Sequence, residues 1–190
     1  MSENDVTEQV SGDFNALLQK AENGDAEAQF KLCLWYNSSY GWDGSEDEVK
    51  ADPEQGLLWL KRSAEGGYAP AQRELGYVYL YGLWGDSLPQ DEALGLQWLD
   101  KAAENDVDCA YSLGLIYLFP HTRVGDSGKP VHIKQDVAKG INLIMRAAAR
   151  NETEEDHEAQ RLLSILNSRK YEELDRFTDS QEDVEGVRQR

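Results

Sequence analysis

The chain has 190 residues, 40% of which are apolar, and a formal net charge of −17 at neutral pH. The apolar content suffices for a continuous core, so the length fits one domain or a short array of repeats. The acidic balance argues against non-specific binding to nucleic acid or anionic membranes, which repel such a surface, and it fits either solubility or complementarity to a basic partner protein.

Both ends of the chain are polar and acidic. We expect residues 1–12 to be disordered and residues 178–190 to form a flexible tail. The N-terminus lacks the basic and apolar regions of a secretory signal, and no apolar run approaches the length of a membrane span, which predicts a cytoplasmic protein. Between the ends, the apolar pattern of residues 13–177 is helical throughout, and no stretch has the alternation and turn chemistry of a β-hairpin.

One helix pattern recurs along this region, with small residues at its first and sixth places, Leu at its fifth and Tyr at its ninth. Full copies occupy residues 28–36, 71–79 and 109–117, a weaker copy begins at Ala159, and residues 14–24 resemble a degenerate one. The small residues permit close helix contact, and the Leu and Tyr lie on one face. Cys33 and Cys109 take small-residue places, which favours buried, reduced thiols over a disulfide or a metal site.

A second helix pattern follows each full copy of the first, at residues 52–64, 91–103 and 136–148. Each copy begins with Asp, which we expect to cap the helix N-terminus. Gly stands at the fifth place, in mid-helix, where it costs about 1 kcal/mol relative to Ala. Its recurrence implies that the backbone of a neighbouring helix lies close. We expect Trp59 and Trp98, at the eighth place, to lie in the core, as do the ninth-place tyrosines of the first pattern.

The loops between the two patterns vary in length. The step from the ninth-place Tyr to the next Asp is 16, 12 and 19 residues, for residues 36–52, 79–91 and 117–136. Loops of this length without structure of their own are often functional.

Because the two patterns alternate, each unit is predicted to be an antiparallel helical hairpin. The sequence thus predicts an all-α fold, an α/α superhelical solenoid of antiparallel helix pairs. The string Ala-x-x-x-Leu-Gly-x-x-Tyr, then a Gly-containing loop and Asp-x-x-x-Gly-x-x-Trp-Leu-x-x-Ala-Ala, resembles the Sel1-like repeat of the tetratricopeptide group. The resemblance covers residues 14–177, with Cys33 in place of Gly in the first copy and Leu143 in place of Trp in the third.

The resemblance implies a non-enzymatic adaptor or scaffold that binds proteins or peptides and lines its concave face with the first helix of each pair. At the matching places the sequence has aromatic, aliphatic and arginine side chains, and aromatics and arginine commonly anchor protein interfaces. These candidate protein-binding residues are Phe30, Leu34, Arg73, Tyr77, Tyr81, Tyr111, Leu115, Phe119 and Arg161. The alternative, that several of the aromatics are inter-helix core, stays open.

The first two loops add three candidate protein-binding aromatics. Tyr40 and Trp42 stand among acidic residues in the first loop, which would suit a basic protein surface, and Trp84 is similar in the second. The alternative is a solvated loop with a tucked aromatic. The acidic residues of the first loop do not have the spacing of a calcium-binding loop.

The third loop contains two histidines and one short motif. His121 and His132 lack a third ligand, so we predict no metal and no cofactor. Gly-Asp-Ser-Gly at residues 125–128 superficially resembles a serine-protease signature, but it stands in a variable loop of a helical repeat, and we interpret it as coincidence. Because the sequence has no phosphate-binding glycine loop and no nucleophile–base pair, we predict that the chain is not an enzyme.

The sequence thus leads to a functional hypothesis: a monomeric, non-enzymatic protein–protein interaction module that inhibits, or gives immunity against, a basic partner protein. The alternative is a regulatory adaptor or scaffold that binds a peptide of a signalling or envelope protein. Neither hypothesis involves nucleic acid or a membrane.

Overall fold

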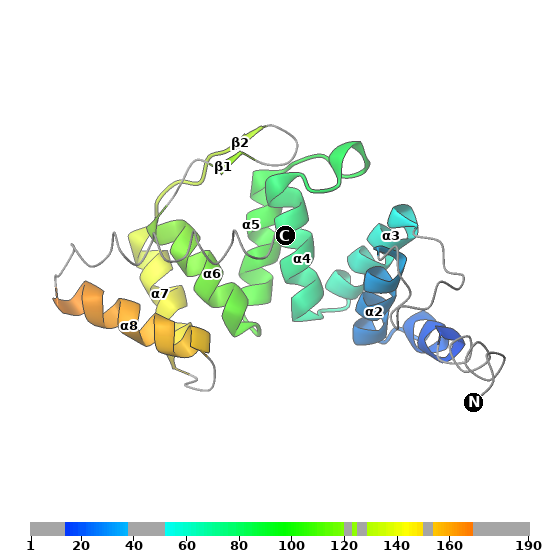
Figure 1. Cartoon of the computed structure of the whole chain (residues 1–190), viewed down its shortest axis with the longest axis horizontal. Helices are drawn as coiled ribbons and strands as arrows, with labels where there is room; N and C mark the ends of the chain where they lie inside the picture. Colours follow the sequence, from blue (N-terminus) through cyan, green and yellow to red (C-terminus); the bar gives the residue numbers. More distant parts are fainter. Residues whose placement is uncertain (1–13, 38–51, 120–122, 125–128, 150–153, 169–190) are drawn as a thin grey trace, which may run out of the picture. The chain divides into compact units, whose positions relative to one another are not determined.

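The computed structural model describes residues 14–37, 52–119, 123–124, 129–149 and 154–168 (Figure 1). A helix covers residues 14–22, and seven more follow in these described ranges. They are α2 (Ala26–Asn37), α3 (Pro53–Glu65), α4 (Ala69–Tyr81), α5 (Glu92–Ala103), α6 (Val107–Leu118), α7 (Val137–Ala148) and α8 (Glu154–Ser168). A 3-10 turn, Gly85–Ser87, follows α4. The predicted disordered ends, residues 1–12 and 178–190, lie outside the described residues.

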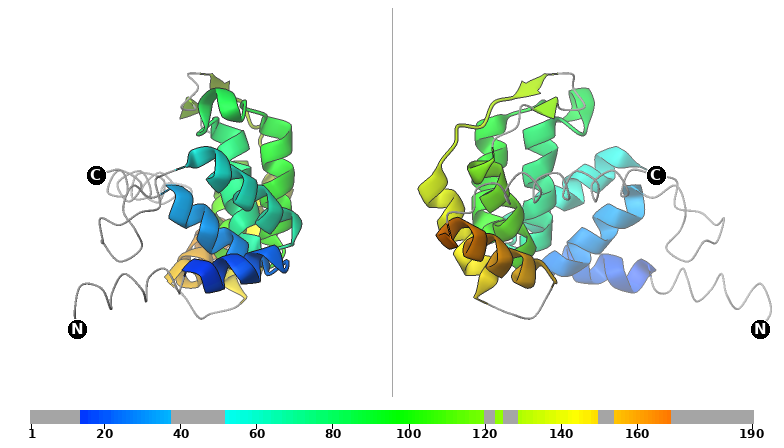
Figure 2. Two further views of the ribbon diagram at one scale, coloured as in Figure 1. Left: turned by 90° about the vertical axis from the view of Figure 1, so that its right-hand side faces the viewer. Right: turned by 60° about the vertical axis from the view of Figure 1, so that its left-hand side comes forward.

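The helices pack in consecutive pairs, α2 with α3, α4 with α5 and α6 with α7 (Figures 1 and 2). One compact unit contains α2 to α5, and a second contains α6 to α8, where α8 packs on both α6 and α7. The predicted all-α fold of antiparallel helix pairs is therefore confirmed.

The same backbone hydrogen bond closes each pair. The N–H of the first-place Asp donates to the carbonyl of the ninth-place Tyr of the preceding helix, at 2.9, 2.9 and 3.1 Å. These bonds join Asp52 to Tyr36, Asp91 to Tyr79 and Asp136 to Tyr117. Each bond fixes the end of one helix beside the start of the next, which makes the pair antiparallel. It also explains why loops of three different lengths leave the helix pairing unchanged.

The predicted aspartate caps are confirmed. The carboxylates of Asp52, Asp91 and Asp136 each accept a hydrogen bond from the backbone N–H three residues on, at 3.1, 3.0 and 2.9 Å. Each carboxylate satisfies a donor that the helix leaves unpaired and lies at the positive end of the helix dipole.

A recurring glutamine side chain joins successive helix pairs, a feature that the sequence analysis did not include. The amide groups of Gln29, Gln72 and Gln160 donate to backbone carbonyls at the end of the preceding helix, at 2.9, 3.1 and 3.1 Å. Those carbonyls belong to Ala21, Ala64 and Ala148 at the C-terminal ends of their helices, and the first two also accept a turn bond from the backbone N–H of Gly24 and Gly67. The repeated Ala-Gln dipeptide is the sequence signal for this bond, and α6 has Ala110 in place of the glutamine.

The mid-helix glycines allow close approach of the paired helices, as predicted, at two of the three places. A Cβ added to Gly95 would lie 2.7 Å from the backbone nitrogen of Leu80, and one added to Gly140 would lie 3.0 Å from the carbonyl oxygen of Gly114. The prediction is wrong for the first pair. There a Cβ on Gly56 would meet the side chain of Asn37, at 2.6 Å from Oδ1, rather than a backbone.

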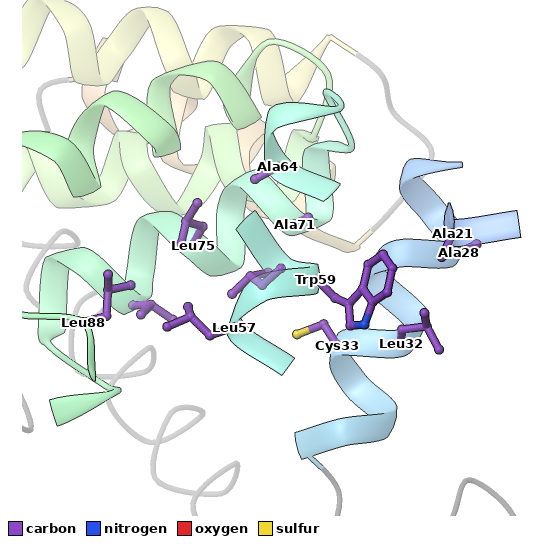
Figure 3. Close-up of a cluster of buried hydrophobic side chains, with 12 residues drawn as sticks. Ala21, Ala28, Leu32, Cys33, Leu57, Trp59, Ala64, Ala71, Leu75 and Leu88 are labelled. Atoms are coloured by element: carbon purple, nitrogen blue, oxygen red, sulfur yellow. The ribbon is translucent and has the colours of Figure 1, made fainter. Parts of the chain in front are cut away.

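The core of the first unit lies between its helices, with Trp59 of α3 only 5% exposed in a cluster that includes Leu32 and Cys33 of α2 (Figure 3). The predicted burial of Trp59 is confirmed, whereas Trp98, Tyr36 and Tyr79 pack against this core but stay partly exposed. In the second unit, Tyr117 is buried as predicted.

Both cysteines are buried free thiols, as predicted. Burial and the negative charge of Glu74 raise the pKa of the Cys33 thiol to about 12, while a hydrogen bond from Asn37 opposes the shift. Cys33 is therefore protonated and unreactive at neutral pH.

The expectation that no stretch forms a β-hairpin is wrong in the third loop. Strands β1 (Arg123–Val124) and β2 (Pro130–Val131) pair antiparallel, with Arg123 opposite Val131 and Val124 opposite Pro130. Strands of two residues are too short to show an alternating pattern, so periodicity could not reveal them.

Candidate functional site

In the first unit, three of the predicted binding residues follow one another along α4. Arg73, Tyr77 and Tyr81 are spaced by four residues, which puts them on one side of the helix, and all three are half-buried. The rings of Tyr77 and Tyr81 stack, with centroids 6.1 Å apart and planes at 19°. This geometry presents two aligned aromatic rings along the helix.

Helix α2 contributes Phe30 and Leu34, also spaced by four residues. The ring of Phe30 packs against that of Tyr68, with centroids 5.5 Å apart, while Leu34 is 43% exposed. Tyr68 directly precedes α4, so the contact brings the middle of α2 to the start of α4. The predicted binding residues of this unit stay predictions, and we call them together the α2–α4 face: Phe30, Leu34, Arg73, Tyr77 and Tyr81.

Tyr68 was missed by the sequence analysis, although the repeat contains a signal for it. In two other copies of the first helix pattern, the corresponding residue is Asp25 or Asp106, whose carboxylate accepts a hydrogen bond from the backbone three residues on. Tyr68 makes no side-chain cap bond and packs on Phe30 instead. An aromatic at a capping position is therefore the signal that this part of the face differs from its neighbours.

Glu74 was also missed, and it adds a charge beside the α2–α4 face. Its side chain is exposed, yet burial of its surroundings raises the pKa of the carboxyl above its ordinary value, an effect that Arg73 partly opposes. Its charge also acts on the thiol of Cys33 in α2. Glu74 is therefore an accessible carboxylate whose charged form is disfavoured by the atoms packed around it.

Trp84 is half-buried and packs against the core of the first unit. Its position therefore fits the alternative to a binding role, in which the aromatic ring of the loop packs against the protein itself. Its neighbour Leu83 is 41% exposed.

In the second unit, the candidate residues are more enclosed. Tyr111 is 5% exposed, belongs to the core between α6, α7 and α8, and lies with its hydroxyl 3.5 Å from an oxygen of the Glu158 carboxylate. The inclusion of Tyr111 in a binding face is corrected, because α8 packs on α6 and covers this ring. Leu115 and Phe119 pack partly buried against the same core, and Arg161 is exposed on α8.

Comparison with known proteins identifies the family. Residues 26–68 and 69–107 each match the family model of the Sel1 repeat. Residues 26–107 therefore consist of two Sel1 repeats. The helix pair α6–α7 follows the matched residues. It has the same aspartate cap as the first two pairs, and its mid-helix glycine, Gly140, lies close to the backbone of α6 at Gly114, so it forms a third pair of the same construction.

Solved Sel1-repeat structures have the same fold. A Sel1 repeat protein from Oxalobacter formigenes is 26% identical, with a TM-score of 0.58 over 78% of this chain and 98% of that one. The protective antigen c5321 of uropathogenic Escherichia coli, described as displaying an SLR fold, is 30% identical, with a TM-score of 0.54 over 73% of this chain and 26% of that one.

A sequence relative is the chitin synthase regulator SKT5 of Saccharomyces cerevisiae (strain ATCC 204508 / S288c). It is 33% identical over 88 residues, which make up 46% of this chain and 12% of the yeast protein. The chain therefore matches only a small part of that relative.

Sel1 repeats mediate protein–protein interactions, and members of the family are typically non-catalytic binding modules. The chain is thus a Sel1-repeat protein-interaction module, and the α2–α4 face lies within its two matched repeats.

Other candidate residues lie outside the described part of the chain. These are Tyr40 and Trp42, whose predicted protein-binding roles stay predictions. Within the described ranges, no three or more His, Cys, Asp or Glu side chains are grouped so as to hold a metal ion. None of the helices described is both long enough and apolar enough to span a membrane.

Proposed function

We propose that this Sel1-repeat protein binds a partner protein with a basic surface and blocks its activity, as an inhibitor or immunity-type partner in the cytoplasm. The observation that carries the proposal is the α2–α4 face, where stacked tyrosines and an exposed leucine lie on a protein-binding scaffold. Aromatic side chains are over-represented among the residues that dominate binding energy at protein interfaces. The net charge of −17 favours a partner of the opposite sign.

The experiment that tests this proposal begins with affinity capture by the full chain at low and near-physiological salt, followed by identification of bound proteins. The captured partner is then purified and titrated. We expect one partner, a one-to-one complex, loss of the partner's activity on binding, and an association rate that falls as salt rises. An association rate that salt leaves unchanged would assign the negative charge to solubility alone.

A second function has one specific observation in its favour. The matched part of the yeast relative belongs to a protein named as a regulator of chitin synthase, which favours a regulatory adaptor that binds a peptide of a signalling or envelope protein. An adaptor would bind two proteins at once and leave their activities intact. Sedimentation of the chain with its captured partners separates a ternary complex from a binary inhibitory one.

A further inference from the structure

Glu74, which lies beside the α2–α4 face, has unusual surroundings. It is exposed to solvent, but the packed atoms around it disfavour its charged form. Among the described residues, no hydrogen bond or ion pair within 4 Å holds its carboxylate. A desolvated carboxylate with no such contact gains more from an incoming cation than a fully hydrated one does, because part of its hydration is already lost.

The basic residue of α2, Lys31, has another partner. Lys31 forms an ion pair with Glu27 of its own helix, at 2.7 Å, and this pair raises the pKa of the lysine. Arg73, next to Glu74 in sequence, lowers the pKa of the Glu74 carboxyl, but burial outweighs its effect. Neither cation therefore compensates Glu74 in full.

The aromatic residues beside Glu74 suit a cation as well. Tyr77 lies one turn further along α4 and stacks on Tyr81. Within the described residues, a Lys or Arg lies over an aromatic ring at three places away from Tyr77, at 4.8, 4.2 and 4.4 Å from the ring centroid. Those pairs are Arg62 with Trp59, Lys101 with Trp98 and Lys139 with Tyr117. A guanidinium or ammonium group is attracted by such ring faces in the same way.

We propose that the α2–α4 face recognises an arginine or lysine side chain of the partner protein, whose charge is bound by the Glu74 carboxylate and whose stem packs against the Tyr77–Tyr81 rings. Leu34, exposed on α2, takes an apolar residue next to that cation. The occupant is thus a partner segment in which a basic residue adjoins an aliphatic one, as the overall charge of the chain also favours. This inference rests on the proposed function and names the chemistry of the partner.

The raised pKa of the Glu74 carboxyl also affects the stability of the fold. A carboxyl whose pKa is higher in the folded than in the unfolded protein destabilises the fold once the pH exceeds its unfolded value. Replacement by neutral glutamine should therefore keep or raise the melting temperature while it weakens binding. A residue with a merely structural role would not combine these two effects.

The test is an NMR titration of the full ¹⁵N-labelled chain with three blocked peptides, Ala-Leu-X-Leu-Ala, where X is arginine, lysine or neutral citrulline. We expect the arginine or the lysine peptide to shift amide signals of α2 and α4, with citrulline binding about tenfold or more weakly, the loss typical of a charged hydrogen bond. Glu74→Gln should weaken cation binding by a similar factor. Glu104→Gln, which removes the same charge from an exposed residue at the end of α5, should bind as the wild type does.

Equal binding of the citrulline peptide, unchanged binding by Glu74→Gln, or no shift on α2 and α4 at millimolar peptide would each overturn the proposal. The affinity of the captured partner for wild type and for Glu74→Gln distinguishes failure of this proposal from failure of the proposed function. If that partner binds wild type and Glu74→Gln with equal affinity, the protein is a binding module that does not use Glu74. If no partner is captured, the proposed function itself fails.

Discussion

The first two helix pairs, α2–α3 and α4–α5, have the same sequence pattern, but different atoms lie against the mid-helix glycine in each pair. In α4–α5, Gly95 lies against the backbone of α4 at Leu80. In α2–α3, Gly56 lies against the side chain of Asn37, and Cys33 takes the place that Gly76 has in the second pair. A glycine that recurs in every copy of a repeat therefore need not make the same contact in every copy, because the group packed against it can be backbone in one pair and a side chain in another.

The largest expected difference between the pairs concerns their tryptophans. Trp59→Ala should lower the free energy of unfolding by about 3–5 kcal/mol, because the ring is buried in the core of the first unit. Trp98→Ala should cost less, since Trp98 stays partly exposed with Lys101 over its ring at 4.2 Å. Urea denaturation followed by circular dichroism measures both. Equal losses would show that exposure does not separate the two positions.

The glycines should differ in sign. Gly95→Ala forces its new methyl group against the backbone of α4 and should destabilise the protein by about 1–3 kcal/mol, as overpacking does. Gly56→Ala meets only the movable side chain of Asn37 and should be neutral or stabilising, by up to the helix-propensity gain of about 1 kcal/mol. Thermal unfolding of both variants is the measurement.

Asn37→Ala provides the control for that comparison. With the amide removed, Gly56→Ala should show more of the propensity gain, because the three atoms nearest to the new methyl group all belong to the Asn37 amide. A marked loss of stability from Gly56→Ala in both backgrounds would mean that the backbones of α2 and α3 approach as closely as those of α4 and α5.

The sequence predicted what depends on local chemistry and repetition. The aspartate caps, the alternating helix pairs and the buried Trp59 follow from residue type and spacing, and the structure confirms them. The binding face was predicted less well, because the exposure of a side chain depends on whether a later helix packs over it. Arg73 and Tyr111 match in the repeat, yet Arg73 is half-buried, whereas α8 covers Tyr111 in the second unit.

Tyr68 and Glu74 were missed for a related reason. Both are departures from the repeat, and a method that aligns copies gives most weight to what the copies share. Asp25 and Asp106 stand where Tyr68 stands, and Lys31 and Ser112 stand where Glu74 stands. If Glu74 binds the partner as proposed, the positions at which one copy differs from the others indicate a specific partner better than the shared positions do.

The aspartate caps of the two pairs are alike, so we expect their alanine variants to lose the same amount of stability. Asp52→Ala and Asp91→Ala should each lower the free energy of unfolding by about 1 kcal/mol, since both carboxylates accept from the backbone at nearly the same distance. Asn, which retains the acceptor oxygen, should restore most of the loss at either position. Chemical denaturation in parallel would test the equality, and a twofold or greater difference would contradict it.

The smallest expected effect belongs to Cys33, the thiol that replaces a glycine in the first pair. Its pKa is raised to about 12, so the folded protein keeps the thiol protonated while the unfolded chain ionises near the ordinary value. The wild type should therefore lose stability as the pH rises through that ordinary value, by about 1 kcal/mol or less at pH 9.5. Cys33→Ala removes this contribution, and the difference in free energy of unfolding between wild type and variant should narrow by that amount between pH 7.5 and pH 9.5. A difference that does not change with pH would show that the thiol ionises in the folded protein as readily as in the unfolded one, and hence that solvent reaches Cys33 in the first pair.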